Sequence, residues 1–485
     1  MKSKKLIFAI LIIFLFSLGL FIQGQDYDVE IQATWGSSNN DFAYSLAVTS
    51  NDLFLAGYTN SFSGLNVGAF LAKFTLSPFN VVWSKGIEIT SSAFYDVAID
   101  IANIFAVGYA FHDKSDRPVI IKFAQADGSF LWAQYLHIGP GVQPGRAFSI
   151  TALRDYYCLS GFLIKEKERG GIFACFDTDG KLNTSYSIFF STSGSGETFY
   201  PYGIASFSSN LFLAGNTSDI TMRGFIAKYD GTSLLVKTTP DSALQNITSI
   251  AVDNTGNLYI TGQYSNSILL AKFDSNLNDI YTKRIQITGN EIGYSIALDP
   301  SNNIYIGGRK GTQPDQAILV KLDNNGNIIW CKSWGGAGDE GIYKIRVDSN
   351  SEVHAAGFSG DINKPLNDIG CSVSTISVVF SPISIATEKL TSTSFKPSIL
   401  KISGNLNSPD NNEALYLKIS PVVTTTVTVT ACPPILLRVN EIEKINIISL
   451  NQILYFSLFT SISLTFLFSY MIISNRRKIK WKKQR

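Results

Sequence analysis

Short runs of Ile, Val, Leu, Tyr and Phe alternate with clusters of Asn, Asp, Gly and Ser through most of this chain. The apolar runs have the length and composition of β-strands. The polar clusters, such as "DNTGN" (253–257), "DPSNN" (299–303) and "DNNGN" (323–327), contain residues that tolerate the positive φ of tight turns. This pattern predicts an all-β protein built from hairpins.

Calcium-binding loops are the alternative interpretation of these Asp-rich stretches. A calcium loop needs several spaced oxygen ligands and a distant bidentate Glu. None of the stretches carries that set. The sequence therefore favours turns.

A repeat of about fifty residues organises the middle of the chain. One glycine near the end of the second predicted strand recurs with spacings of 51, 53, 54, 47, 46 and 49 residues, at Gly57, Gly108, Gly161, Gly215, Gly262, Gly308 and Gly357. A basic residue inside the next apolar strand recurs at Lys73, Lys122, Lys228, Lys272 and Lys321, and Cys175 takes its place in the third unit. Four strands per unit at this period predict a seven-bladed β-propeller.

The unit "WGGAGDEGIYKIRVDSNSEVHAAG" (334–357) is the best match in this chain to the pattern WGG.G.D…S…VD..GN.Y..G, and the other units are degraded versions of it. On these residues the chain resembles the seven-bladed β-propeller repeat family of bacterial and archaeal surface proteins. The resemblance covers roughly residues 30–402. It implies a propeller fold and a place at the cell surface, and it implies no particular activity.

The ends of the repeat region suggest how the ring closes. Residues 29–48 align with residues 328–347, so Ile31 to Trp35 match an outermost strand without a blade of its own. An unpaired blade edge is a template for aggregation. We therefore expect this strand to pair with the last blade and close the propeller.

The last unit contains an insertion near 359–395. Its next strand candidate carries Lys401, 44 residues after Gly357, whereas earlier units need 10 to 16 residues. The insertion includes the strand-like run 374–386, which suggests a hairpin projecting from one face. Long loops on a rigid scaffold often bind partners, although a variable decoration is an equal alternative. Lys418, in "EALYLKIS", competes with Lys401 for the third strand of this blade.

Both ends of the chain predict export and membrane anchoring. Residues 1–24 have a basic start and an apolar stretch, which is typical of a signal peptide, with an uncleaved anchor as the alternative. Residues 451–474 are long and apolar enough for a transmembrane helix. The basic tail 475–485 is then cytoplasmic by the positive-inside rule, and a nucleic-acid-binding arm is the disfavoured alternative.

The segment 421–450 lies between the last predicted blade and the predicted membrane span. It contains "TTTVTVTACPP" (424–434). Thr-rich segments beside membranes are typical of glycosylated stalks. Similar runs also resemble the tails of surface-layer-associated proteins of hot-spring archaea. We interpret 421–450 as a stalk, and the propeller as residues 25–420.

The overall net charge of +2 conceals an acidic exported part. Without three lysines at the front and seven basic residues at the back, 30 basic residues face 38 acidic ones, a net charge of about −8. Nucleic-acid binding requires clustered Lys and Arg. The exported part therefore disfavours a nucleic-acid partner.

Few residues suggest chemistry. Cys158 and Cys175 fall opposite each other if Phe162 pairs with Gly171, which predicts a disulfide, with two buried thiols as the alternative. The other cysteines, Cys331, Cys371 and Cys432, have no evident partner. Candidate N-glycosylation sites are Asn183, Asn216 and Asn246, which begin N-x-S/T sequons.

No catalytic or metal-binding motif stands out, and no cofactor is expected. His112, His137 and His354 lack metal-site spacing, and no nucleophile or phosphate-binding motif has its required context. These observations favour a membrane-anchored extracellular propeller that binds a protein or glycan, in adhesion, surface-layer association or glycan recognition. A glycan hydrolase or lyase with its site at the channel mouth, or a purely structural envelope protein, is the alternative.

Overall fold

The structure, a computed structural model, describes residues 27–421 except for short gaps at 37–39, 61–66, 90, 140, 142, 167, 193–196, 219–221, 240–243, 288–289, 312–313, 360–364, 397–398, 402–404 and 407–412. The predicted signal peptide, transmembrane helix, basic tail, Cys432 and the stalk beyond Pro421 lie outside the described residues. Within residues 27–421, no helix has the length and apolar character needed to cross a bilayer.

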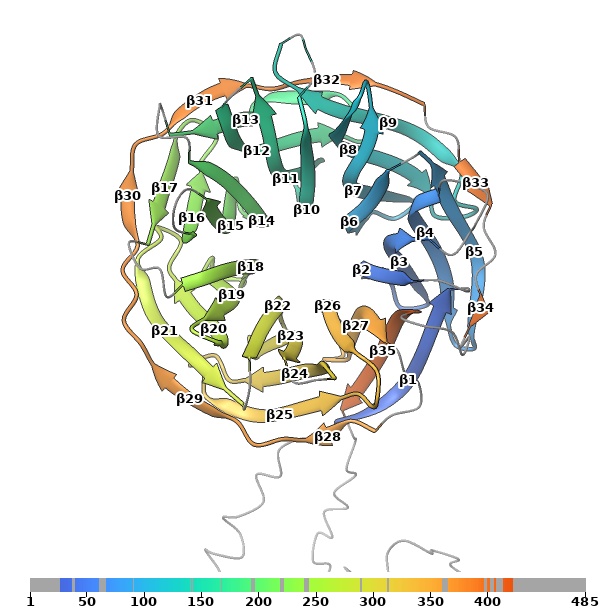
Figure 1. Cartoon of the computed structure of the whole chain (residues 1–485), viewed down its shortest axis with the longest axis vertical. Helices are drawn as coiled ribbons and strands as arrows, with labels where there is room; N and C mark the ends of the chain where they lie inside the picture. Colours follow the sequence, from blue (N-terminus) through green and yellow to red (C-terminus); the bar gives the residue numbers. More distant parts are fainter. Residues whose placement is uncertain are drawn as a thin grey trace, which may run out of the picture. The chain divides into compact units, whose positions relative to one another are not determined.

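Seven antiparallel sheets stand around a central axis and form a β-propeller (Figure 1). Blade 1 consists of β2(Asp41–Val48), β3(Asp52–Thr59), β4(Val67–Leu76) and β5(Phe79–Glu88). Blade 2 consists of β6(Ser92–Ile99), β7(Asn103–His112), β8(Ser115–Ala124) and β9(Phe130–His137). Blade 3 consists of β10(Gly145–Leu153), β11(Tyr156–Lys165), β12(Glu168–Asp177) and β13(Leu182–Ser191). Blade 4 consists of β14(Thr198–Phe207), β15(Asn210–Ser218), β16(Arg223–Tyr229) and β17(Leu234–Thr238). Blade 5 consists of β18(Leu244–Val252), β19(Leu258–Tyr264), β20(Ser267–Phe273) and β21(Asp279–Gln286). Blade 6 consists of β22(Asn290–Leu298), β23(Ile304–Gly311), β24(Gln316–Leu322) and β25(Ile328–Trp334). The predicted seven-bladed propeller is confirmed.

Blade 7 joins the two ends of the repeat region. It consists of β26(Glu340–Val347), β27(Val353–Ser359), β35(Glu413–Pro421) and β1(Tyr27–Gly36). The N-terminal strand β1 pairs antiparallel with β35, with Trp35 opposite Ala414. Trp35 is 1% exposed and packs against Phe70 of blade 1 at 4.7 Å between ring centroids. The predicted closure by the N-terminal strand is confirmed.

The third strand of blade 7 carries Lys418, which decides between the two candidates left open by the sequence. Lys418 lies in β35, which pairs with β27. Lys401 lies in β33(Ile399–Lys401), which pairs with β5 of blade 1. Since β27 and β35 are neighbours in the sheet, the chain between them is a single insertion of 53 residues, 360–412.

This insertion forms a belt around the propeller, not the projecting hairpin that the run 374–386 suggested. Its short strands follow the rim of the ring (Figure 1) and each adds a fifth strand to a different blade. Passing from blade 6 back round to blade 7, the belt strands are β28(Asn367–Asp368), β29(Ser372–Thr375), β30(Ser381–Ile383), β31(Ala386–Lys389), β32(Thr391–Ser394), β33 and β34(Asn405–Leu406). The alternation of Thr, Ser, Val and Ile in this segment is consistent with strands that pair through their backbone along an exposed edge.

Side chains also fasten the belt to the blades. Cys371 of the belt forms a disulfide with Cys331 of β25, a pairing that the sequence did not predict. Leu390 and Val378 are 1% and 6% exposed and pack into the cores between blades. Lys165 of blade 3 pairs with Glu388 of the belt at 2.6 Å. The belt is therefore part of the packed structure.

The hydrophobic core lies between the blades. Seven clusters of buried apolar side chains each join two neighbouring blades. In blades 2 and 5 the basic residue of the third strand connects blades in a second way, because its ammonium reaches a turn of the next blade. Lys122 donates to the Thr178 carbonyl at 2.7 Å, and Lys272 donates to Asn324 at 2.6 Å.

Candidate ligand-binding channel

The innermost strand of every blade contains a β-bulge at the same place. The register shifts across Tyr44 in β2, and equivalent shifts occur in the other six innermost strands. A bulge leaves one residue unpaired and redirects its side chain. The residues at the bulges are Tyr44, Tyr95, Phe148, Tyr202, Thr248, Tyr294 and Tyr343.

The recurring glycine explains why these bulges can form. A Cβ added to Gly308 would overlap the carbonyl oxygen of Ile292, just before the bulge in β22. A Cβ at Gly57 would overlap the Phe42 carbonyl in the same way, and the other five recurring glycines face equivalent carbonyls. Glycine is therefore required for close approach of two backbones.

Six of the seven bulge residues are aromatic and contact one another around the channel. We call them the aromatic arc: Tyr294, Tyr343, Tyr44, Tyr95, Phe148 and Tyr202. Successive ring centroids along this order are 5.3, 5.4, 5.4, 5.8 and 4.7 Å apart. The seventh bulge residue, Thr248, is not aromatic and so interrupts the arc. Its hydroxyl donates to the Gly293 carbonyl at 2.5 Å.

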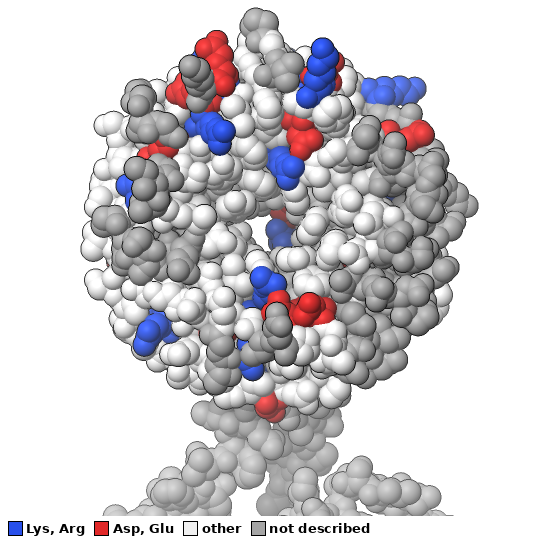
Figure 2. Space-filling view, viewed as in Figure 1, with Lys and Arg blue, Asp and Glu red and all other residues white. Residues whose placement is uncertain are grey.

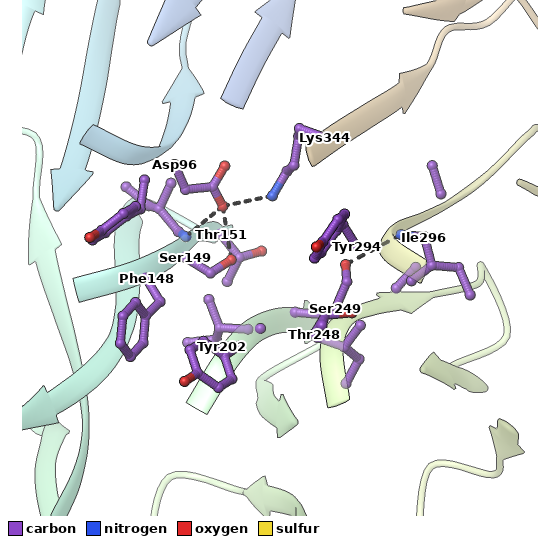
Figure 3. A pocket seen from close by; sticks show the side chains of 18 of the residues that line it. Asp96, Phe148, Ser149, Thr151, Tyr202, Thr248, Ser249, Tyr294, Ile296 and Lys344 are labelled. Carbon is purple, nitrogen blue, oxygen red and sulfur yellow. Dashed lines mark hydrogen bonds and ion pairs between the residues drawn. The ribbon is translucent and has the colours of Figure 1, made fainter. Parts of the chain in front are cut away.

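The arc borders a cavity of about 620 Å³ inside the channel. A hollow with charged atoms in it is visible at the centre of the ring (Figure 2). Besides the arc, its lining includes apolar residues such as Ile150 and Ile296 and hydroxyl groups of Ser149, Thr248 and Ser249 (Figure 3). This volume and this mixture of aromatic and hydroxyl groups are typical of small-molecule sites.

Asp96 provides the only carboxylate among the described residues that line the cavity. Its side chain is 1% exposed, and it accepts hydrogen bonds from Ser45 at 2.6 Å and from Ser149 at 2.8 Å. Lys344 of β26, in blade 7, reaches toward Asp96 (Figure 3), and its ammonium lies 3.0 Å from the carboxylate, while Arg346 is 3.6 Å away. Asp96 therefore joins four consecutive blades, and its oxygens are occupied.

These contacts decide the charge of the cavity. Burial of Asp96 raises its pKa, but the charges of Lys344 and Arg346 outweigh burial and hold the pKa at about 2. Burial lowers the pKa of Lys344 to about 8, and Asp96 offsets this only in part. At neutral pH one carboxylate therefore faces two cations, a net charge of +1 among the lining residues.

The hydroxyl groups of the arc stay protonated at neutral pH. Burial, with a smaller contribution from Tyr294, raises the pKa of Tyr343 to about 12. Burial also raises the pKa of Tyr44. Near the rim, Arg146 donates to the Tyr95 hydroxyl at 3.2 Å and pairs with Asp116 at 2.8 Å. The arc therefore offers neutral donors and acceptors beside apolar ring faces.

The candidate sites from the sequence lie elsewhere. Cys158 and Cys175 are opposite each other in β11 and β12 and form a disulfide. Both lie in the hydrophobic core between blades 3 and 4. Of the sequons, Asn216 is 2% exposed and its amide nitrogen donates to Asn246, so burial leaves no room for a glycan there. Asn246 lines the cavity, whereas Asn183 is partly exposed near the start of β13.

His112 and His137 lie in blade 2 and both contact the Tyr135 ring. His354, in blade 7, has acidic neighbours that the sequence analysis did not connect with it. His354 lies in β27, and the carboxylates of Asp348 and Glu352 are close enough for all three to hold one metal ion. The aromatic arc was also missed. Its signal is present in the sequence, because each arc residue lies 13 or 14 positions before a recurring glycine.

Comparisons with known proteins give no family for this chain. The sequence matches no protein-family profile and no curated protein, so the resemblance to the surface-protein repeat family remains a prediction. Among solved structures the chain is similar to Sqt1 from Chaetomium thermophilum (TM-score 0.41, 10% identity, 68% of this chain and 83% of that one). It is also similar to a protein of unknown function from Dyadobacter fermentans (TM-score 0.41, 10% identity, 73% and 100%). A third similar structure is the phage phi92 endosialidase (TM-score 0.38, 10% identity, 68% and 64%). Similarity at this level carries no argument about activity.

Proposed function

We propose that this protein is an exported, membrane-anchored propeller that binds a glycan in its central channel without cleaving it. The observation that carries the proposal is that the aromatic arc lines the cavity while both carboxylate oxygens of Asp96 already accept hydrogen bonds from the protein. Aromatic faces pack against the apolar face of a sugar ring, while nearby hydroxyl groups exchange hydrogen bonds with its hydroxyls. A net charge of +1 suits a neutral or acidic glycan.

The same geometry argues against glycoside hydrolysis in this cavity. Hydrolysis by the common mechanisms requires two carboxylates, about 5–5.5 Å apart in retaining and about 6.5–9.5 Å apart in inverting enzymes. Among the described lining residues there is one, and its low pKa makes it a poor general acid. Recognition therefore fits the channel better than catalysis.

Placement at the cell surface rests on the sequence at both ends. The apolar stretch in residues 1–24, the Thr-rich segment 421–450, the apolar stretch 451–474 and the basic tail support export with a cytoplasmic C-terminus. Protease treatment of intact cells tests this topology. We expect loss of epitopes within residues 27–421 and protection of an epitope at the C-terminus.

A glycan array and a product assay, run in parallel on the full-length protein in detergent, test the function. We expect saturable binding to a subset of glycans, which are recovered with unchanged mass. Shortened or unsaturated products would show that the protein is an enzyme. Absence of binding across neutral and acidic glycans would contradict recognition.

A further inference from the structure

Three blades allow a comparison at the turn between their first and second strands. In blade 5, Asp253 accepts hydrogen bonds from the Asn257 amide at 2.9 Å and from the Tyr259 hydroxyl at 3.1 Å. In blade 6, Asp299 accepts from Asn303 at 2.8 Å and from Tyr305 at 3.3 Å. In both turns the Oδ2 atom of the aspartate therefore accepts from two neutral side chains.

Blade 7 has the same turn with two substitutions. Asp348 keeps the aspartate position and accepts from the backbone N–H groups of Asn350 and Glu352, both at 2.9 Å. Glu352 stands where blades 5 and 6 have Asn, and His354 stands where they have Tyr. Both neutral donors to the aspartate are thus replaced, one by an acceptor and one by an imidazole.

The second observation is the imidazole nitrogen that points at this turn. His354 is 1% exposed, and its Nε2 has no hydrogen-bond partner. Nε2 lies 3.6 Å from Asp348 Oδ2, which is longer than a good hydrogen bond. Two ligands of one Zn²⁺ ion, each at about 2.0–2.2 Å from it, are about 3.3 Å apart in a tetrahedral site.

We propose that Asp348, Glu352 and His354 bind a divalent transition-metal ion, for which Zn²⁺ is the probe. Their candidate ligand atoms all lie within 4.8 Å of one another, so small side-chain rotations bring them to one ion. One imidazole and two carboxylates leave a fourth position for water. The two carboxylate side chains are 25% and 21% exposed, which gives the ion a path from solvent.

The neighbouring groups orient the ligands and balance the charge. His354 Nδ1 is 2.8 Å from the Tyr416 hydroxyl, a contact that fixes the ring and directs Nε2 toward the carboxylates. The Lys418 ammonium lies between Glu352 at 3.1 Å and Glu30 at 2.9 Å. Three carboxylates and one ammonium leave a charge of −2, which a divalent ion neutralises. Lys418 can remain paired with Glu30 when Glu352 binds the ion.

The location gives the site a role in ring closure. Glu30 belongs to the N-terminal strand β1, Lys418 and Tyr416 belong to β35, and His354 belongs to β27. These are the three strands whose pairing closes the propeller. Since binding to the folded state stabilises it, an ion here strengthens the closure.

The test measures Zn²⁺ binding by the untagged, full-length protein after removal of metal with EDTA. Isothermal titration and elemental analysis are expected to give one Zn²⁺ per chain. At a free concentration about 100-fold above the dissociation constant, we expect the Tm to rise by a few degrees. Failure to bind a stoichiometric ion would overturn the proposal.

The matched variant gives blade 7 the residues of blade 6, Glu352→Asn with His354→Tyr. It is expected to fold and to bind Zn²⁺ at least about 100-fold more weakly. Asp348→Asn, which retains an acceptor for the turn, provides a second test if the double variant does not fold. His112→Ala, at a partly exposed histidine beside Asp113, should bind like the parent. Equal binding by the parent and by both ligand variants would also overturn the proposal.

Discussion

At the scale of the residue, Asp96 and the recurring glycines show two ways in which single positions shape the channel. Asp96 holds four blades together through hydroxyl groups, a backbone N–H and Lys344. The glycines act by lacking a side chain, because each lets the carbonyl beside a bulge approach. Asp96 therefore supplies interactions between blades, whereas the glycines allow the backbone geometry that directs the aromatic arc into the channel.

Replacement of Asp96 by Asn tests the buried ion pair through pH. The folded pKa of Asp96 is about 2 against an ordinary 3.8, so the stabilisation from its ionised form is complete above 3.8 and is lost as pH falls through 2. The shift corresponds to about 2 kcal/mol. We expect Asp96→Asn to be clearly less stable than the parent at pH 7, because Lys344 loses its partner.

This difference in unfolding free energy should narrow by about 2 kcal/mol between pH 5 and pH 2. Urea unfolding of both proteins at several pH values measures it. Lys165, an exposed partner of Glu388, provides the control through Lys165→Met, for which we expect a change of under about 1 kcal/mol. If the difference in unfolding free energy between Asp96→Asn and the parent did not change with pH, the ion pair would be contradicted.

Replacement of Gly308 by Ala tests the requirement for close backbone approach. The added Cβ overlaps the Ile292 carbonyl, and relief requires movement of two paired strands. We expect a loss of about 1–3 kcal/mol in unfolding free energy, as for overpacked sites. Gly370→Ala, in the belt with no atom within 4 Å of the added Cβ, should be close to neutral. Equal effects of the two substitutions in denaturant unfolding would refute this role.

At the scale of the element, the belt protects the outer strands of all seven blades. Exposed strand edges invite pairing with other chains, and here a single segment covers seven of them. The insertion was predicted from its length, but its path was not. Its strands are two to four residues long, so they carry almost no periodic signal, and their positions depend on edges that exist only after the blades have formed.

The belt can be removed at a natural junction. Ser359 and Glu413 are directly opposed in β27 and β35, so an Asn-Gly turn can replace residues 360–412. Cys331→Ser accompanies the deletion, since its partner is removed. We expect a loss of at least about 5 kcal/mol from the disulfide and the buried Leu390 and Val378, together with self-association.

Light scattering after size-exclusion chromatography and thermal unfolding measure these effects. The full-length chain with Cys331→Ser and Cys371→Ser isolates the contribution of the disulfide. We expect this control to lower the Tm while the protein stays monomeric. A belt-less variant that is monomeric with the parent's Tm would show that the belt is dispensable.

At the scale of the whole molecule, the sequence predicts the ring better than its channel. The seven regularly spaced glycines predicted seven blades. The match between residues 29–48 and residues 328–347 predicted that the N-terminal strand closes the ring. The channel was harder, because Tyr44 and Tyr343 contact each other at 5.4 Å only once the ring has closed. The Cys158–Cys175 pair, by contrast, lies within one hairpin, so its register can be counted along the chain.

The central claim is that the aromatic arc is the ligand-binding surface, and substitution within the arc tests it most directly. Thr248 occupies the equivalent position in blade 5, so Tyr343→Thr introduces a residue that the fold already accepts there. Affinity for the best glycan on the array is measured by calorimetry for the parent, Tyr343→Thr and the exposed-aromatic control Phe111→Thr. We predict that Tyr343→Thr weakens binding about tenfold or more, equivalent to about 1.4 kcal/mol, while Phe111→Thr leaves it unchanged. Unchanged affinity in a folded Tyr343→Thr protein would place the binding site outside the channel.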